Sequence, residues 1–387
     1  MDRKLLAIVS IVATVAACTQ HDLTEGIPSD LLAPPASEYL EAVDSAQTIA
    51  RVRMAELNLP GVSVAVGIGG EIVWAEAFGW SDLSRQTPAT PQTLYPVGSI
   101  SKPLTATAAG LLYERGLLDF ELPIQEYLPD FPEKRWTFTT GQAMGHIASL
   151  QNVGSYQALR SVPCDNGVEE MPGISEDTLL FEPGYRFRYS NYGYMLVGAV
   201  VEAASGEPYL DFMQREVFAP LGLDRTVPDL GTVPDAATKY DRRAFRTMRQ
   251  AHEVDMSCAM AAGGFLSTPS ELVRFGFATL YAELLQQETV DLFWTPQRLN
   301  NGEPTGYGFG WSIGTAGLGV DGGRTPYVGH GGSVIGGRAQ LMILPDEDMV
   351  VVTMTNTSAD VYYLARRVAA IFREFGENRS DGVSSTQ

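Results

Sequence analysis

Strand patterns at both ends of the chain, with a mainly helical stretch between them, constrain the fold of this sequence most. Residues 61–66 and 71–78 are apolar, β-branched runs around a glycine pair, which predicts a β-hairpin. Helical periodicity marks residues 37–58 before this hairpin and residues 359–375 near the C-terminus. Four later runs have strand character, at residues 308–313, 327–328, 339–344 and 349–355.

These patterns predict an α+β fold, in which an antiparallel β-sheet is built from both chain ends, is flanked by N- and C-terminal helices and carries an inserted helical domain. We place the sheet-forming part at residues 37–98 and 291–377 and the helical insert at 99–290. With 45% apolar and 19% charged residues, the chain can bury a large core. Residues 378–387 are expected to form a flexible tail.

The net charge and the positions of the histidines limit the classes of ligand that the protein can bind. A formal net charge of −19 disfavours nucleic-acid binding, because that affinity comes mainly from clustered Lys and Arg. The four histidines are scattered, and no Cys or His pair has the spacing of metal ligands. We therefore expect a small-molecule or peptide substrate, with no nucleic acid, no metal and no cofactor. The sequence leaves the oligomeric state open.

The N-terminus has the features of a bacterial export signal. Two basic residues precede an apolar run that is too short to span a bilayer, and Cys18 stands where a lipoprotein box has its lipidated cysteine. We expect a signal peptide at residues 1–17, a flexible tether at 18–36, and a lipid anchor at the periplasmic face of a bacterial membrane. The alternative is an ordinary signal peptide that releases a soluble periplasmic protein.

Two further cysteines, Cys164 and Cys258, can pair as a disulfide in an oxidising compartment. The alternative is two buried free thiols, since the sequence gives no distance between them. Both states stay open.

The sharpest local motif is Ser99-Ile100-Ser101-Lys102, which an apolar run follows. If Ser99 begins a helix, its hydroxyl and the Lys102 amine lie one turn apart, beside the unpaired N–H groups of the first turn. A neutral lysine can take the serine proton, and burial and the positive helix N-terminus both lower the pKa of its ammonium group. Only four lysines occur in the chain, which makes this one more informative. The alternative is a capping serine with an incidental lysine.

A second motif, Tyr189-Ser190-Asn191, precedes a predicted helix at residues 193–204. A tyrosine held near a lysine can shuttle protons, and an asparagine amide can bind a substrate carbonyl. Taken alone, the aromatic residues around this motif favour packing over chemistry.

A third motif, Gly329-His330-Gly331-Gly332-Ser333, lies between strand patterns near the C-terminus. Glycines on an edge strand let a substrate backbone approach closely. The N–H groups of Ser333 and Ser99 would then form an oxyanion hole, with about 3 kcal/mol of stabilisation per donor. Taken alone, a glycine-rich stretch is more often a turn.

Together and in this order, the three motifs resemble the serine β-lactamase and penicillin-binding protein superfamily. Its usual signature is Ser-x-x-Lys, then Tyr-x-Asn, then Lys-Thr-Gly or His-x-Gly. The resemblance extends from about residue 60 to 356 and includes the stretches at 117–131, 145–150 and 262–268. Within the superfamily, the sequence looks most like class C β-lactamases and LACTB-type lactamase-like serine proteases.

The resemblance implies a β-lactamase/DD-peptidase-like fold and an exported serine hydrolase that cleaves an amide or ester bond through an acyl-enzyme. It also implies a set of site residues: Ser99 as nucleophile, Lys102 and Tyr189 as general bases and acids, Asn191 for the acyl side chain, and His330, Gly331 and Gly332 for substrate binding. Gly331 departs from the pattern, because many members have a threonine there that recognises a substrate carboxylate. His330 replaces the usual lysine and would offer positive charge only when protonated. This departure favours a peptidase or esterase over a class C-like β-lactamase.

Two other hypotheses compete. Ser312 lies in a Gly-x-Ser-x-Gly sequence like the nucleophile elbow of α/β-hydrolases, but four glycines in the next nine residues leave no room for the helix that such an elbow requires. A non-hydrolytic penicillin-binding sensor or scaffold would keep the same fold and be acylated without turnover.

Overall fold

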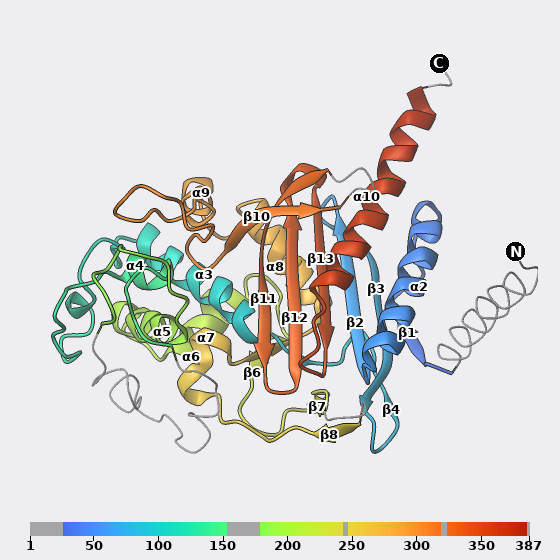
Figure 1. Ribbon diagram of the computed structural model, residues 1–387, viewed down its shortest axis with the longest axis horizontal. Coiled ribbons are helices and arrows are strands. Elements are labelled where there is room, and N and C mark those ends of the chain that lie inside the picture. The colour runs from blue at the N-terminus through green and yellow to red at the C-terminus, as the bar shows by residue number, and fades with distance from the viewer. Residues whose placement is uncertain (1–25, 153–178, 243–246, 319–322, 385–387) are drawn as a thin grey trace, which may run out of the picture.

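The computed structural model describes residues 26–152, 179–242, 247–318 and 323–384 (Figure 1). The predicted signal peptide, the lipidation site Cys18 and the cysteine Cys164 lie outside these residues. Among the helices of the described ranges, none is both long and apolar enough to cross a membrane.

One antiparallel sheet forms the centre of the molecule, as predicted, and its strands come from both ends of the chain (Figure 1). The pairing of β2 with β13 joins the two ends, since Val62 to Ile68 on one strand oppose Thr355 to Met349 on the other. A short strand, β4 (Thr87–Pro88), pairs with β3 outside the main order. The main order is β1 (Ser29–Leu31), β3 (Glu71–Asp82), β2 (Gly61–Ile68), β13 (Met349–Thr355), β12 (Gly337–Leu344), β11 (Arg324–Val334) and β10 (Ser312–Gly317).

Helices cover both faces of this sheet. On one face α2 (Leu40–Leu57) and α10 (Tyr362–Ser384) lie side by side, and Phe372 of α10 stacks on Trp74 of β3 at 6.0 Å between ring centroids (Figure 1). On the other face α8 (Pro269–Leu280) packs against β2, β12 and β13. The strands between these layers are buried on both faces, which explains why β2 and β13 are mostly apolar and contain no charged residue.

A mainly helical region extends from one edge of the sheet (Figure 1). Its centre is α3 (Ser101–Glu114), which contacts α5 (Asn191–Ser205) and α7 (Met260–Gly263). The remaining elements are short: α4 (Thr140–Met144), α6 (Tyr209–Phe212) with a π-turn at Met213–Phe218, α9 (Gln287–Phe293), the three-stranded sheet of β5 (Tyr95–Pro96), β9 (Phe265–Ser267) and β6 (Val227–Pro228), and the pair β7 (Tyr240–Arg242) and β8 (Met248–Gln250).

The structure corrects two predicted boundaries. The expected tether at 18–36 contains β1, which pairs with β3 at the sheet edge with Ser29 opposite Phe78. Three residues in an otherwise polar stretch are too few to show strand periodicity. The expected helical insert at 99–290 contains α8, which packs on the sheet. In contrast α9, whose Phe293 lies 5.9 Å from Phe120 between ring centroids, belongs to the helical region and extends past residue 290.

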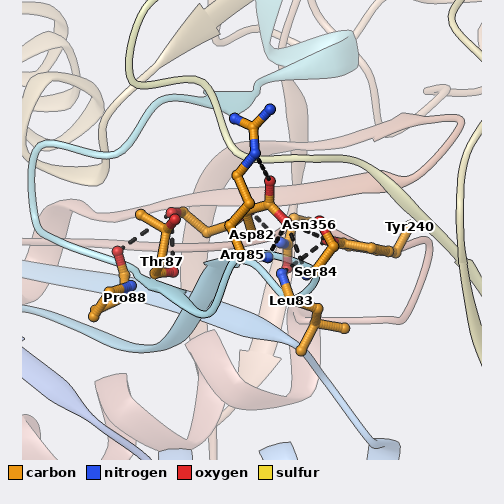
Figure 2. Close-up of polar contacts among 9 residues, drawn as sticks. Asp82, Leu83, Ser84, Arg85, Thr87, Pro88, Tyr240 and Asn356 are labelled. Carbon is orange, nitrogen blue, oxygen red and sulfur yellow. Dashed lines mark hydrogen bonds and ion pairs between the residues drawn. The ribbon is translucent and has the colours of Figure 1, made fainter.

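A buried asparagine, Asn356, connects the central sheet to the chain that leads into β7, at one end of the sheet. The Asn356 Oδ1 accepts from the Gly61 N–H at 3.0 Å, and its Nδ2 donates to the carbonyls of Trp80 and Thr238. Beside it, the Tyr240 hydroxyl accepts from the Leu83 N–H at 2.8 Å, within the turn that Asp82 begins (Figure 2). One side chain thus connects β2, β3, β13 and the chain that leads into β7.

Candidate active site

The nucleophile candidate Ser99 lies in a 3₁₀ turn, Gly98–Ile100, just before α3. This differs from the prediction that Ser99 itself begins the α-helix, which starts two residues later at Ser101. The turn requires glycine at position 98, where φ is +52° and an added Cβ would lie 2.5 Å from the Ser333 nitrogen. The hydroxyl is therefore presented by a tight turn that packs directly against β11.

The Lys102 side chain points from the first turn of α3 into the protein, and Lys102 is fully buried. Its Nζ lies 3.1 Å from the Ser99 Oγ, 2.8 Å from the Asn191 Oδ1 and 2.7 Å from the Ala262 carbonyl oxygen. The last two partners only accept hydrogen bonds. A neutral amine has two N–H groups for these acceptors, so its lone pair is left to face the Ser99 hydroxyl.

The surroundings of Lys102 favour that neutral form. Burial holds the pKa of its ammonium well below the usual value, because the charged form loses its hydration. No carboxylate is among its hydrogen-bond partners in the described ranges to offset this loss. The amine therefore has the protonation state and the position of a general base for Ser99.

The Tyr-x-Asn motif brings Tyr189 and Asn191 next to the Lys102 amine. The Tyr189 ring is partly exposed, and its centroid lies 4.9 Å from the Lys102 Nζ. Ser190 caps α5 through its Oγ, which accepts from the Gly193 N–H, so the helix begins at Asn191 rather than at the predicted residue 193. The Asn191 carbonyl oxygen accepts from Lys102. Its contact with an acyl side chain stays a prediction, and this bond shows that Asn191 orients the lysine.

The glycine-rich motif forms the middle of β11, a longer strand than the two residues predicted at 327–328. A Cβ at Gly332 would lie 1.9 Å from the Val97 carbonyl oxygen, so this glycine allows β11 to approach the Ser99 turn. The Ser333 nitrogen lies beside Gly98, one residue from Ser99. This arrangement places the two predicted oxyanion-hole N–H groups on neighbouring segments.

His330 is engaged inside the protein and does not carry the positive charge that its position suggested. Its Nδ1 lies 2.8 Å from the Gly331 carbonyl oxygen, so Nδ1 carries the proton, and its Nε2 accepts from the Tyr307 hydroxyl at 2.9 Å. Burial and, next, the nearby Lys102 lower the pKa of His330 to about 3. The ring is therefore neutral at neutral pH, and Gly331 beside it is exposed without a side chain to recognise a carboxylate.

Three groups near the site were not predicted. Tyr307 is buried and fixes the His330 tautomer, and its position between Gly306 and Gly308 was the only signal in the sequence. His146 stacks on Tyr189 with 4.2 Å between ring centroids. The Ala262 carbonyl oxygen holds Lys102, and no sequence pattern marks a main-chain acceptor of this kind.

Two other predictions can be placed. Ser312 is the first residue of β10, where it opposes Gly329, and no helix follows it, so the nucleophile-elbow hypothesis fails. Cys258 is buried and disulfide-bonded. Its pairing with Cys164 stays a prediction, because Cys164 lies outside the described residues.

Comparison with known proteins agrees with this arrangement. Mouse serine beta-lactamase-like protein LACTB, mitochondrial, is 27% identical, with 85% of this chain and 77% of the relative covered. A D-aminopeptidase of Brucella anthropi is 28% identical, with 77% of this chain and 56% of the relative covered. The solved structure of a class C beta-lactamase superposes with a TM-score of 0.71 at 18% identity, covering 87% of this chain and 98% of that one.

The fold and the site define a class of serine hydrolases in which a buried lysine adjoins the nucleophile. The Beta-lactamase family matches residues 46–372, which is most of the chain. The chain belongs to this family, within the superfamily of serine β-lactamases and penicillin-binding proteins that its motifs predicted.

Proposed function

We propose that the protein hydrolyses an amide or ester bond through an acyl-enzyme on Ser99, as a peptidase or esterase rather than chiefly a β-lactamase. The observation that carries this proposal is the Lys102 amine. It is fully buried, it lies 3.1 Å from the Ser99 Oγ, and two acceptors hold it in place. An incidental surface lysine would have none of these properties.

The chemistry follows from these positions. Neutral Lys102 takes the Ser99 proton while the oxygen attacks the substrate carbonyl carbon, and the negative oxygen of the tetrahedral intermediate binds the Ser99 and Ser333 N–H groups. The proton then passes to the leaving group through Tyr189, whose ring centroid lies 4.9 Å from the Lys102 Nζ. Water attacks the resulting ester and releases the acid, which restores the Ser99 hydroxyl.

Two features support a peptidase or esterase. A β-lactam presents a carboxylate near its reacting bond, and the neutral His330 ring and the bare Gly331 provide neither charge nor hydroxyl for it. A substrate with an uncharged leaving group loses nothing at such a site. The D-aminopeptidase relative acts on amides, which agrees with this preference.

The proposal is tested by exposing wild type, Ser99→Ala and Ser312→Ala to a fluorophosphonate, followed by intact-mass measurement. We expect one adduct on wild type and on Ser312→Ala, and none on Ser99→Ala. The same three proteins are then assayed with p-nitrophenyl esters, D-Ala-D-Ala peptides and nitrocefin. We expect p-nitrophenyl ester turnover to exceed nitrocefin turnover and to fall by at least about 10³-fold in Ser99→Ala.

Other outcomes would count against the proposal in distinct ways. Adduct formation on Ser99→Ala would exclude Ser99 as the nucleophile. A permanent adduct with every acyl donor would support a penicillin-binding sensor without turnover. Nitrocefin as the best substrate would make the protein a class C-like β-lactamase.

A further inference from the structure

Two buried residues after α4 adopt an unusual backbone conformation next to the candidate active site. His146 has φ of +60° and Ser149 has φ of +65°, a region that side chains other than glycine adopt uncommonly. Both are almost completely buried. Both also bind the segment that returns from residue 179 to α5, in which Tyr189 lies.

His146 holds the main chain on both sides of Tyr189. Its carbonyl oxygen accepts from the Arg188 N–H at 2.8 Å, and its Nδ1 accepts from the Ser190 N–H at 3.2 Å. Its ring lies against the Tyr189 ring, with 4.2 Å between centroids and 41° between planes. Tyr189 is thus bracketed by a single residue, while its own ring remains partly exposed toward Lys102.

The protonation of His146 follows from these contacts. Because Nδ1 accepts from a main-chain N–H, the neutral ring carries its proton on Nε2. Burial holds the His146 pKa well below its usual value, because the charged ring would lose its hydration, so the ring stays neutral. Its buried Nε2 has no hydrogen-bond partner in the described part of the chain.

This unpaired group indicates what the histidine is for. A buried N–H without a partner destabilises a fold by about 1–3 kcal/mol. An apolar side chain would fill the space among Tyr189, Tyr194 and Tyr307 without that loss. It would, however, lack the Nδ1 acceptor for Ser190. The histidine is therefore explained by its acceptor, which aligns the tyrosine, rather than by packing.

From this geometry we propose that His146 is the positioning residue for Tyr189, and that it sets the distance between the phenol and the Lys102 amine through its contacts with residues 188 and 190. This inference rests on the proposed function, in which Tyr189 relays protons. His146 itself touches neither Ser99 nor Lys102 among the hydrogen bonds of the described residues.

The experiment compares His146→Ala with Ser149→Ala. The Ser149 Oγ accepts from the Phe181 N–H at 2.6 Å, so both substitutions remove a buried acceptor for the same returning segment, at the same backbone conformation. Only the first lies beside Tyr189. We measure the rate of fluorophosphonate labelling, kcat and KM on a p-nitrophenyl ester, and the melting temperature of each.

We expect His146→Ala to slow labelling and to lower kcat by about 10²-fold with KM little changed, the usual cost of a misplaced catalytic group. The acidic limb of its pH profile should move to lower pH, because a displaced Tyr189 ring no longer stabilises the Lys102 ammonium and the pKa of that group falls further. Ser149→Ala should be labelled at a rate within about 3-fold of wild type and should keep the wild-type pH profile. This should hold even if its melting temperature falls as much as that of His146→Ala.

A second pair of variants keeps the test decisive if His146→Ala fails to fold. Asparagine tolerates positive φ and presents an oxygen near the Nδ1 position, whereas glutamine presents its polar atoms near Nε2 only. We expect His146→Asn to restore most of the labelling rate and His146→Gln to remain slow.

The inference would be overturned if His146→Ala were labelled at the wild-type rate, or if Ser149→Ala were slowed as much as His146→Ala. It would also be overturned if glutamine at position 146 restored the labelling rate better than asparagine. Absence of labelling in the wild-type protein would instead overturn the proposed function. The two failures are therefore distinguishable in one set of measurements.

Discussion

At the scale of single residues, the site depends on an amine and an imidazole that stay neutral, although lysine is usually charged at neutral pH and histidine usually titrates near it. Lys102 and His330 are both buried, and burial lowers the pKa of each. The amine thereby becomes a base, while the imidazole becomes a fixed hydrogen-bonding link to Tyr307. Acid should therefore affect both the activity and the stability of the protein.

The His330 ring gives a pH prediction with a defined sign. Its pKa is about 3 in the folded state, against about 6.5 in an unfolded chain, so between these values the unfolded state binds more protons. The free energy of unfolding should fall as the pH falls through this window, by up to about 1.4 kcal/mol per pH unit for this group. Above about pH 6.5 the group should have no effect.

His330→Gln removes the titration and keeps a side chain that can accept from Tyr307. Urea denaturation of wild type and of this variant at several pH values from 4 to 7 measures the difference. Carboxylates titrate alike in both proteins, so the difference isolates His330. Parallel curves for the two proteins would show that the ring is not buried in its neutral form.

At the scale of elements, β11 and the Ser99 turn must approach closely for the oxyanion hole to form. Gly98 and Gly332 allow this approach, since an added Cβ at either would meet main-chain atoms of the other segment at 2.5 Å and 1.9 Å. Main-chain atoms cannot rotate away as a flexible side chain can. The separation of the two segments is therefore set by glycine.

Gly332→Ala should push β11 away from Val97 and destroy the alignment of the Ser333 N–H. We expect fluorophosphonate labelling to fall by about 10²- to 10³-fold and the free energy of unfolding by about 1–3 kcal/mol. Gly314→Ala on the neighbouring β10 is the matched control, because an added Cβ there would meet only the Tyr327 ring, at an ordinary contact distance of 3.5 Å. Similar losses in both variants would contradict the proposed role of Gly332.

Local patterns predicted the elements better than they predicted the site's geometry. The hairpin, the last two strands and the terminal helices follow from periodicity and glycine turns, and the family from the order of three motifs. The 3₁₀ turn at Ser99 depends on packing against β11, and β1 exists only because β3 offers it a free edge. The neutral state of His330 depends on burial, which its own neighbours in sequence do not reveal.

At the scale of the whole molecule, Asn356 joins elements that no local interaction connects. It is fully buried at the end of β13 and binds Gly61, Trp80 and Thr238. Its main-chain carbonyl also accepts from the Tyr240 N–H at 3.0 Å. Its position therefore couples the central sheet to the segment leading back from the helical region.

Asn356→Ala should strand several buried main-chain groups at once. We expect the free energy of unfolding to fall by about 3 kcal/mol or more, since each unpaired buried group costs about 1–3 kcal/mol. Asn300→Ala is the comparison, because Asn300 is exposed and its side chain donates only one hydrogen bond, to the Pro183 carbonyl, in the described ranges. It should cost less than about 1 kcal/mol. Chemical denaturation measures both, and equal effects would refute the coupling role of Asn356.

The joining of the two chain ends in one sheet also orders events during synthesis. Gly61 and Asn356 are 295 positions apart, so a ribosome must release nearly the entire polypeptide before the central strands can pair. A nascent chain already contains the serine and the lysine but lacks the strand that faces them. Under the proposed mechanism, acyl transfer must therefore wait until β11 has been translated and can bring the Ser333 N–H to the oxyanion.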